Sequence, residues 1–69
     1  MRTADALNRL ELNLPEIKEF LDDRKAVFQR TAKKDDVRGE IRGSLATLRR
    51  LRQIDDAEFR ALLTYYTLK

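Results

Sequence analysis

Hydrophobic residues recur along this chain at the three- and four-residue spacing of amphipathic helices. One set comprises Ile17, Phe20, Leu21, Val27 and Phe28, and a second comprises Val37, Ile41, Leu45, Leu48 and Leu51. Residues three and four apart are neighbours on a helical surface, so each set forms one apolar face. The first set predicts a helix over residues 14–30, and the second predicts a helix over residues 36–53.

The start of the first of these helices carries a capping pattern. In Asn13-Leu-Pro-Glu16 the Asn13 side chain can cap the helix while Glu16 reaches back to the backbone of Asn13. Leu12 and Ile17 stand where a hydrophobic staple would form, and Pro15 falls in the first turn, which tolerates proline. The pattern predicts a helix that begins near residue 14.

Asp55-Asp-Ala-Glu58 repeats the same pattern near the end of the chain. Asp55 is the expected cap, Glu58 is its reciprocal carboxylate, and Ile54 and Phe59 are the expected staple. A helix over residues 56–67 follows, with its apolar face at Phe59, Leu62, Leu63 and Tyr66. Capping likewise accounts for Asp35 or Asp36 at the start of the helix before it.

Two parts of the pattern are weaker. Residues 3–11 carry Ala6, Leu7 and Leu10 after a possible cap at Thr3, which predicts a short first helix. Gly39 and Gly43 interrupt the third helix, and each costs about 1 kcal/mol relative to alanine, so this helix is expected either to run through them or to begin late, at Ser44. We therefore expect an all-α fold, a small bundle of three to four short helices in a single domain over residues 1–69.

Composition narrows the chemistry. The 69 residues include no cysteine and no histidine, which excludes disulfides and thiolate zinc sites and removes the usual general base and thiolate nucleophile. The Asp22-Asp23, Asp35-Asp36 and Asp55-Asp56 pairs do not suit a metal, because adjacent helical residues point about 100° apart. We expect a protein that is not an enzyme, with no catalytic residue, metal or cofactor.

Size and hydropathy bear on assembly and location. A chain this short buries only about 60% of its unfolded surface, and a second copy is one way to cover what remains, so we expect a homo-oligomer and favour a dimer. No run of 18 apolar residues or apolar signal sequence is present. These features predict a cytoplasmic protein with no transmembrane segment.

Positive charge is concentrated in the third predicted helix. Residues 31–54 hold seven basic and three acidic side chains, 7 − 3 = +4, whereas the whole chain carries +3. Arg38, Arg42 and Arg49 fall within about 40° of one another on a helix, Arg52 lies slightly nearer the apolar stripe, and Lys33 and Lys34 precede them. This row is a candidate surface for phosphates or an acidic partner. The alternative is that the arginine stems cover the edge of the core and leave their charges in water.

Two further residues are candidates for contacts. Arg24 projects into the apolar stripe between Ile17, Leu21 and Phe28, so it either pairs with a carboxylate at a subunit interface or on an acidic ligand, or extends to solvent at the edge of the stripe. Tyr65 points about 100° away from the face of Tyr66. It is a possible partner contact, since tyrosine is enriched at interfaces, or an exposed residue near the chain end.

Residues 45–63 combine a leucine pattern with the turn Ile54-Asp-Asp-Ala-Glu-Phe59 and the following Leu62-Leu63. This segment resembles the short helical hairpins called SHOCT domains, in which a glycine usually occupies the turn position that is Arg52 here. The resemblance covers under a third of the chain. It implies a small oligomerising or interaction module and supplies no catalytic residues.

Three functions are compatible with these features. The first is a small helical protein–protein interaction module, self-associating, that presents a basic, tyrosine-bearing surface of its third and fourth helices to a protein partner of unknown identity. The alternative is a regulatory protein that binds DNA or RNA through the arginine row, although no helix carries the exposed mixture of arginine, asparagine and glutamine that reads bases. A third is binding to anionic lipid through an amphipathic helix that lies on the membrane surface. Only the basic residues beside the apolar stripe of the third helix support it.

Overall fold

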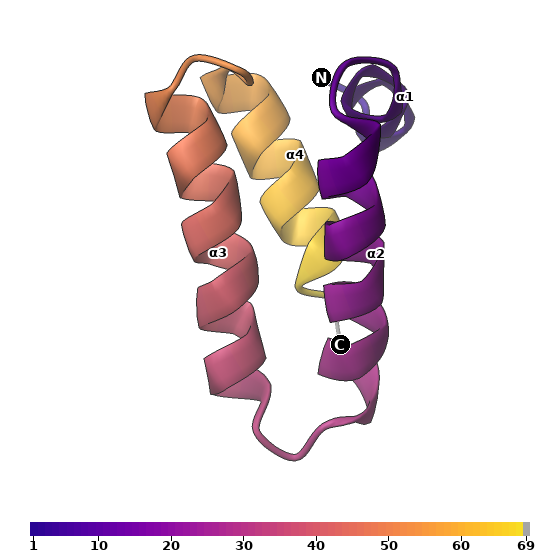
Figure 1. The fold of residues 1–69 in the computed structure, drawn as a ribbon, viewed down its shortest axis with the longest axis vertical. Coiled ribbons are helices and arrows are strands. Elements are labelled where there is room, and N and C mark those ends of the chain that lie inside the picture. Colours follow the sequence, from indigo (N-terminus) through magenta and orange to yellow (C-terminus); the bar gives the residue numbers. More distant parts are fainter. Residues whose placement is uncertain (69) are drawn as a thin grey trace.

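The computed structural model describes residues 1–68 and contains four α-helices in that part of the chain (Figure 1). They are α1 (Thr3–Asn13), α2 (Pro15–Arg30), α3 (Lys34–Arg50) and α4 (Asp56–Tyr66). The last three run along the long axis of the molecule, and α1 lies across one end, where it packs on α2 and α4. The all-α prediction is confirmed, and so is the number of helices.

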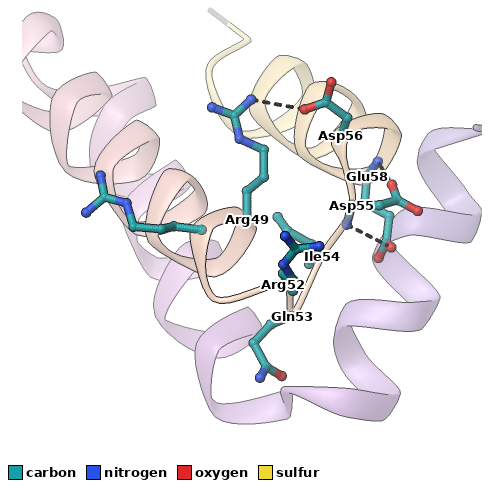
Figure 2. A pocket seen from close by; sticks show the side chains of 8 residues that line it. Arg49, Arg52, Gln53, Ile54, Asp55, Asp56 and Glu58 are labelled. Atoms are coloured by element: carbon teal, nitrogen blue, oxygen red, sulfur yellow. Dashed lines mark hydrogen bonds and ion pairs between the residues drawn. The ribbon is translucent and has the colours of Figure 1, made fainter.

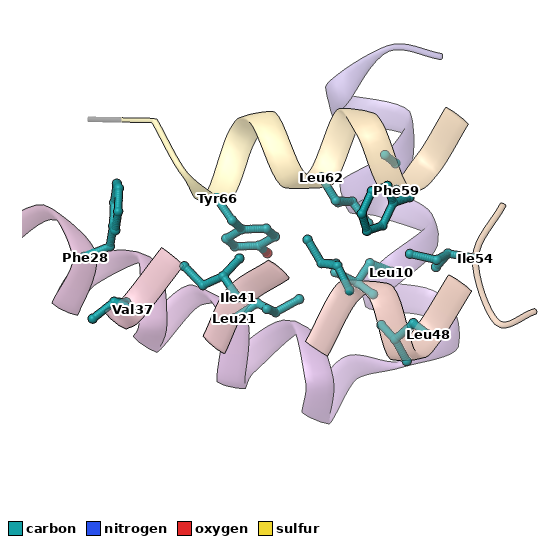
Figure 3. Close-up of a cluster of buried hydrophobic side chains, with 12 residues drawn as sticks. Leu10, Leu21, Phe28, Val37, Ile41, Leu48, Ile54, Phe59, Leu62 and Tyr66 are labelled. Atoms are coloured by element: carbon teal, nitrogen blue, oxygen red, sulfur yellow. The ribbon is translucent and has the colours of Figure 1, made fainter. Parts of the chain in front are cut away.

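All four helices contribute to one cluster of buried side chains (Figure 3). Leu10 comes from α1, Leu21 and Phe28 from α2, Ile41 and Leu45 from α3, and Leu62 and Tyr66 from α4, and each of these side chains is at most 1% exposed. The ring of Tyr66 reaches from α4 into this cluster. Burying a large apolar side chain contributes about 1.5–3 kcal/mol, so the apolar stripes predicted for the helices are what holds them together.

The predicted cap at Asn13 is wrong. Asn13 is the last residue of α1, and the N–H of Leu14 still donates to the carbonyl of Leu10 at 2.8 Å, so Leu14 alone separates α1 from α2. No side chain caps α2, and Leu12 is 82% exposed, which rules out its role in a staple. Pro15 occupies the first turn of α2 as predicted, where its missing N–H costs nothing.

Two other predicted caps are also absent. The cap position of α1 is Arg2, so Thr3 lies inside the helix, and α1 extends two residues past the expected end at residue 11. Lys33 occupies the cap position of α3 without a side-chain hydrogen bond, and Asp35 and Asp36 fall in the first helical turn. Carboxylates in a first turn still favour the helix, because they interact with the positive end of its dipole.

Gly39 and Gly43 lie within a continuous α3, so the late start at Ser44 is wrong. Both glycines are exposed, and a methyl group added to either would have no atom within 4 Å apart from the adjacent residues and the backbone of its own helix. Neither glycine is therefore required by packing inside the chain. The helix persists through them because its other face, from Val37 to Leu48, is buried in the core.

The capping box predicted at the start of α4 is confirmed. The Asp55 carboxylate accepts from the N–H of Glu58 at 2.8 Å, and the Glu58 carboxylate accepts from the N–H of Asp55 at 3.3 Å. Ile54 and Phe59, the expected staple, are both buried in the core cluster. This helix ends at Tyr66, one residue before the predicted end.

Helix α3 ends at Arg50, three residues before the predicted end at residue 53, and the α3–α4 turn follows. The N–H of Arg52 donates to the carbonyl of Arg49 at 3.0 Å and the N–H of Gln53 donates to that of Leu48 at 2.9 Å, which together form a Schellman motif. Arg52 has a φ of 61°, in the left-handed region that this motif requires and that glycine adopts most easily. It is the position at which the resembling hairpins usually carry glycine.

Candidate interaction surfaces

The arginine row of α3 is partly engaged inside the molecule. Arg38 donates to Asp35 at 3.0 Å and lies 5.5 Å from the ring centre of Phe28. Arg49 donates to Asp56 at the start of α4 at 3.2 Å, and its guanidinium stands 4.1 Å from the ring centre of Phe59. Both arginines therefore cover aromatic edges of the core, which is the alternative that the sequence left open.

The lysines that precede the row behave differently from each other. Lys34 donates to the backbone carbonyl of Phe28 at 2.6 Å and lies 4.9 Å from its ring centre, so it ties the start of α3 to the end of α2. Lys33 is exposed at the cap position. Lys33, Arg42 and Arg52 form no ion pair with any residue of the described part of the chain. These three are the members of the predicted basic surface whose side chains form neither an ion pair nor a hydrogen bond within residues 1–68.

A depression at the α3–α4 turn brings basic and acidic side chains together (Figure 2). The basic residues of its lining are Arg49, Arg50 and Arg52, and the acidic residues are Asp55, Asp56 and Glu58. Figure 2 shows the pairing of Arg49 with Asp56 across the turn and the capping bonds between Asp55 and Glu58. The carboxylates here are occupied in holding the hairpin, and the mixed charge does not favour an anionic ligand over a cationic one.

Arg24 forms an ion pair within the chain. Its Nη1 donates to Oε2 of Glu40 on α3 at 3.1 Å, and its guanidinium lies 5.9 Å from the ring centre of Phe20. The side chain is 31% exposed, so it extends from the apolar stripe to solvent at the α2–α3 boundary. A carboxylate partner was expected at a subunit interface or on a ligand, and α3 of the same chain supplies one.

The two tyrosines of α4 have different environments. Tyr65 is half-buried, and the ammonium of Lys25 stands 3.4 Å from its ring centre while donating to its backbone carbonyl at 3.1 Å. Tyr65 therefore already has a cationic neighbour on its ring. Tyr66 is fully buried, as predicted for a core residue, and its hydroxyl donates to Asp22 at 2.7 Å.

The Tyr66 hydrogen bond links α4 to a small charged network on α2. Burial raises the pKa of Tyr66 well above its ordinary value of 10.0, and the bond to Asp22 raises it further. Asp22 also accepts from Lys18 at 2.9 Å, and this bond raises the pKa of Lys18 above 10.5 despite partial burial. Phenol and ammonium thus both remain protonated at neutral pH.

An open apolar groove runs between α2 and α3, on a face for which the sequence predicted no function. Its lining consists of Glu16, Ile17 and Phe20 of α2 and of Ser44, Thr47 and Leu48 of α3. The Phe20 side chain is 45% exposed. The hydroxyl of Thr47 donates to the carbonyl of Gly43 at 2.9 Å, so the methyl group is the free part of this side chain. The groove thus offers carbon atoms to solvent along two helices.

The sequence contained a signal for this groove. Phe20 and Leu21 are consecutive, so they point about 100° apart on a helix, and the apolar stripe of α2 is wider than one neighbouring helix can cover. Leu21 is fully buried and Phe20 is not. Which of the two would remain exposed depends on where α3 and α4 lie.

Two kinds of feature are absent from residues 1–68. No group of three or more acidic side chains in this part of the chain is arranged to hold a metal ion. None of the four helices has the length and apolarity needed to cross a membrane.

Comparison with known proteins returned no relative. No family model matches the chain, no curated protein matches it, and no solved structure resembles its fold closely enough to be a match. The similarity of the α3–α4 hairpin to SHOCT domains therefore stays a resemblance of the turn and its leucines.

Proposed function

We propose that this chain is a non-enzymatic protein–protein interaction module that binds a helix of its partner in the α2–α3 groove. The observation that supports the proposal is the exposed Phe20 side chain beside Ile17 and Leu48 on a bundle whose other large aromatic rings are covered. Grooves between two helices commonly receive the apolar face of a third helix. A phenylalanine left half in water gives such a partner apolar area to bury.

The α3 wall suits close approach of another helix. Gly43, Ser44 and Thr47 are small, and with Glu40 they occupy the i, i+3, i+4 and i+7 positions that form a hole for one large side chain of a facing helix. Gly43 in particular is not required by any contact within the chain. A partner residue inserted here would contact the Phe20 ring and the Thr47 methyl group.

The basic surface of α3 receives less support as a contact surface. Arg38, Arg49 and Lys34 each have contacts within the chain, which leaves Lys33, Arg42 and Arg52 as charges available to a partner. Three scattered cations are few beside the 6–10 phosphate contacts of strong nucleic-acid binders. DNA or RNA binding through the α3 row is therefore the weaker proposal.

Self-association is a competing use of the same groove. A second copy would cover Phe20 and add buried area to a chain of only 69 residues. The two occupants differ in a measurable way, because a second copy yields a complex of twice the chain mass.

Site-specific photo-crosslinking in the native host cell tests the proposal. A photoreactive benzoylphenylalanine at position 20 is expected to give one discrete covalent adduct, whereas the same residue at Thr64, exposed on α4, gives none. Thr47→Arg fills the groove from an exposed position of α3 and should abolish the adduct without unfolding the chain. An adduct that survives Thr47→Arg, or equal labelling from positions 20 and 64, would contradict groove binding.

A further inference from the structure

We propose that the partner segment is a basic amphipathic helix, with one large apolar residue flanked by lysine or arginine on the same face. This inference rests on the proposed function and adds the chemical class of the partner. It comes from the charges that surround the apolar floor of the groove.

On the α2 side, two carboxylates flank the exposed phenylalanine. Glu16 precedes Phe20 by four residues and Asp23 follows it by three, so all three share one face of the helix. Both carboxylates are exposed, and neither forms an ion pair with any residue from 1 to 68. They are charges that a partner can neutralise.

The α3 side carries the same sign. Asp36, Glu40, Gly43 and Thr47 follow one another at spacings of four, three and four residues, which places them along one face. Asp36 has no ion-pair partner in the described chain, and Glu40 is bonded to Arg24. Arg50 follows Thr47 by three residues and continues this row, so the rim holds four carboxylates and two guanidinium groups, a net charge of 2 − 4 = −2, on a protein whose total charge is +3.

The negative charge of the rim favours one possible occupant of the groove over the others. A symmetric dimer through the groove would place each acidic rim against the same rim of the other copy, because a two-fold interface pairs a surface with itself. Nucleic acid and anionic lipid would be repelled in the same way. A helix that carries cations on either side of an apolar residue would gain attraction at each end and bury its apolar residue on Phe20.

The geometry also sets the spacing expected in the partner. Glu16 and Asp23 are seven residues apart, which corresponds to about 10.5 Å along the helix axis. Two cations seven residues apart in the partner helix, with the apolar anchor three or four residues from each, would reach both carboxylates at once. Rim charges of this kind chiefly affect selectivity and association rate, whereas the apolar anchor supplies affinity.

Binding of designed peptides measures this preference directly. The probe is a fluorescein-labelled, alanine- and glutamine-based helix of about 18 residues, with a central leucine and lysines three residues before and four residues after it. A second peptide carries glutamates in place of both lysines, and a third carries serine in place of the leucine. Anisotropy titrations at low salt should show about tenfold tighter binding of the lysine peptide than of the glutamate peptide, since two exposed ion pairs become two repulsive ones.

Variants of the protein identify which of its carboxylates determine the preference for the lysine peptide. The double variant Glu16→Lys and Asp23→Lys should reverse the preference, and added salt should shrink the wild-type ratio toward one. The matched control Asp5→Lys and Glu11→Lys changes the total charge equally but on α1, and it should leave the preference in place. Reversal in the control as well would mean that only the overall charge matters, and it would overturn the inference.

The outcomes separate this inference from the proposed function. Equal binding of the lysine and glutamate peptides, lost when the leucine becomes serine, would keep the groove as a helix-binding site and overturn the basic partner. Both the inference and the proposed function would be overturned if replacing the leucine of the lysine peptide by serine, and replacing Thr47 of the protein by arginine, each left binding unchanged. Failure of the lysine peptide to bind at millimolar concentration would overturn the inference, while the crosslink from position 20 decides the proposed function. A crosslinked homodimer would replace the basic helix by a second copy as the occupant.

Discussion

Replacing Arg52 by glycine is expected to stabilise the protein, although it removes a residue that the sequence marked as a possible binding contact. Arg52 holds the left-handed position of the Schellman motif that ends α3, with a φ of 61°. A residue with a Cβ atom pays roughly 1–2 kcal/mol for this conformation. Glycine adopts it freely, but loses about 0.5–1 kcal/mol more backbone entropy on folding than other residues do.

The difference between these two effects gives the expected gain. Arg52 forms no ion pair with the described residues, so no ion pair is lost, and we expect Arg52→Gly to stabilise the fold by about 0.5–1 kcal/mol. For a chain of this size, 1 kcal/mol corresponds to a rise in Tm of roughly 4–8 °C. The gain should appear as a higher denaturation midpoint with an unchanged m value, because the surface buried on folding does not change.

Urea denaturation followed by circular dichroism, together with thermal melts, measures this effect. Arg52→Ala is the matched control, since it also removes the charge but keeps the Cβ atom, and it should give no gain. Moderate salt in all samples screens the change in net charge. If the alanine variant gains as much as the glycine variant, the benefit comes from charge and the assignment of backbone strain to Arg52 is wrong.

Three further predictions concern stability. Gly39→Ala and Gly43→Ala should each stabilise α3 by about 0.5–1 kcal/mol, because both sites are helical and exposed, and an added methyl group would meet no neighbouring side chain or helix within 4 Å. A loss of stability in urea melts would show that these two positions are not unobstructed helical sites. Tyr66→Phe removes the bond to Asp22 and should cost about 1–2 kcal/mol at pH 7, with Tyr65→Phe as the control for losing a phenol. The raised pKa of Tyr66 also predicts that stability falls above pH 10.0, because the unfolded phenol releases its proton there while the folded one keeps it. The pKa of Lys18 is raised in the same direction, so the deprotonation of this lysine in the unfolded chain adds to the loss of stability. Denaturation midpoints measured between pH 8 and 11 should therefore fall less steeply with pH in Tyr66→Phe than in the wild type, but they should still fall.

The features that the sequence predicted well are those set by neighbouring residues. The apolar spacing of residues 17–28 and 37–48 defines α2 and α3 to within a few residues, because the periodicity of a helix is a local property. The capping box at Asp55 and Glu58 formed as expected, since both partners lie within one turn and nothing before them continues a helix. The same reasoning failed at Asn13, where the preceding helix extends through the capping residue and leaves only Leu14 as a link.

The tertiary structure decided which charges and apolar groups remain available. The partners of Arg24 and Arg49 are Glu40 and Asp56, on neighbouring helices, and no spacing rule within one helix selects them. Phe20 is exposed and Leu21 buried only because α3 and α4 cover one side of the wide α2 stripe. The amino-acid sequence alone therefore determined the helices and their apolar faces, through interactions between residues a few positions apart. The groove, its acidic rim and the loss of much of the arginine row follow from how the helices pack, since packing sets which side chains from distant segments meet.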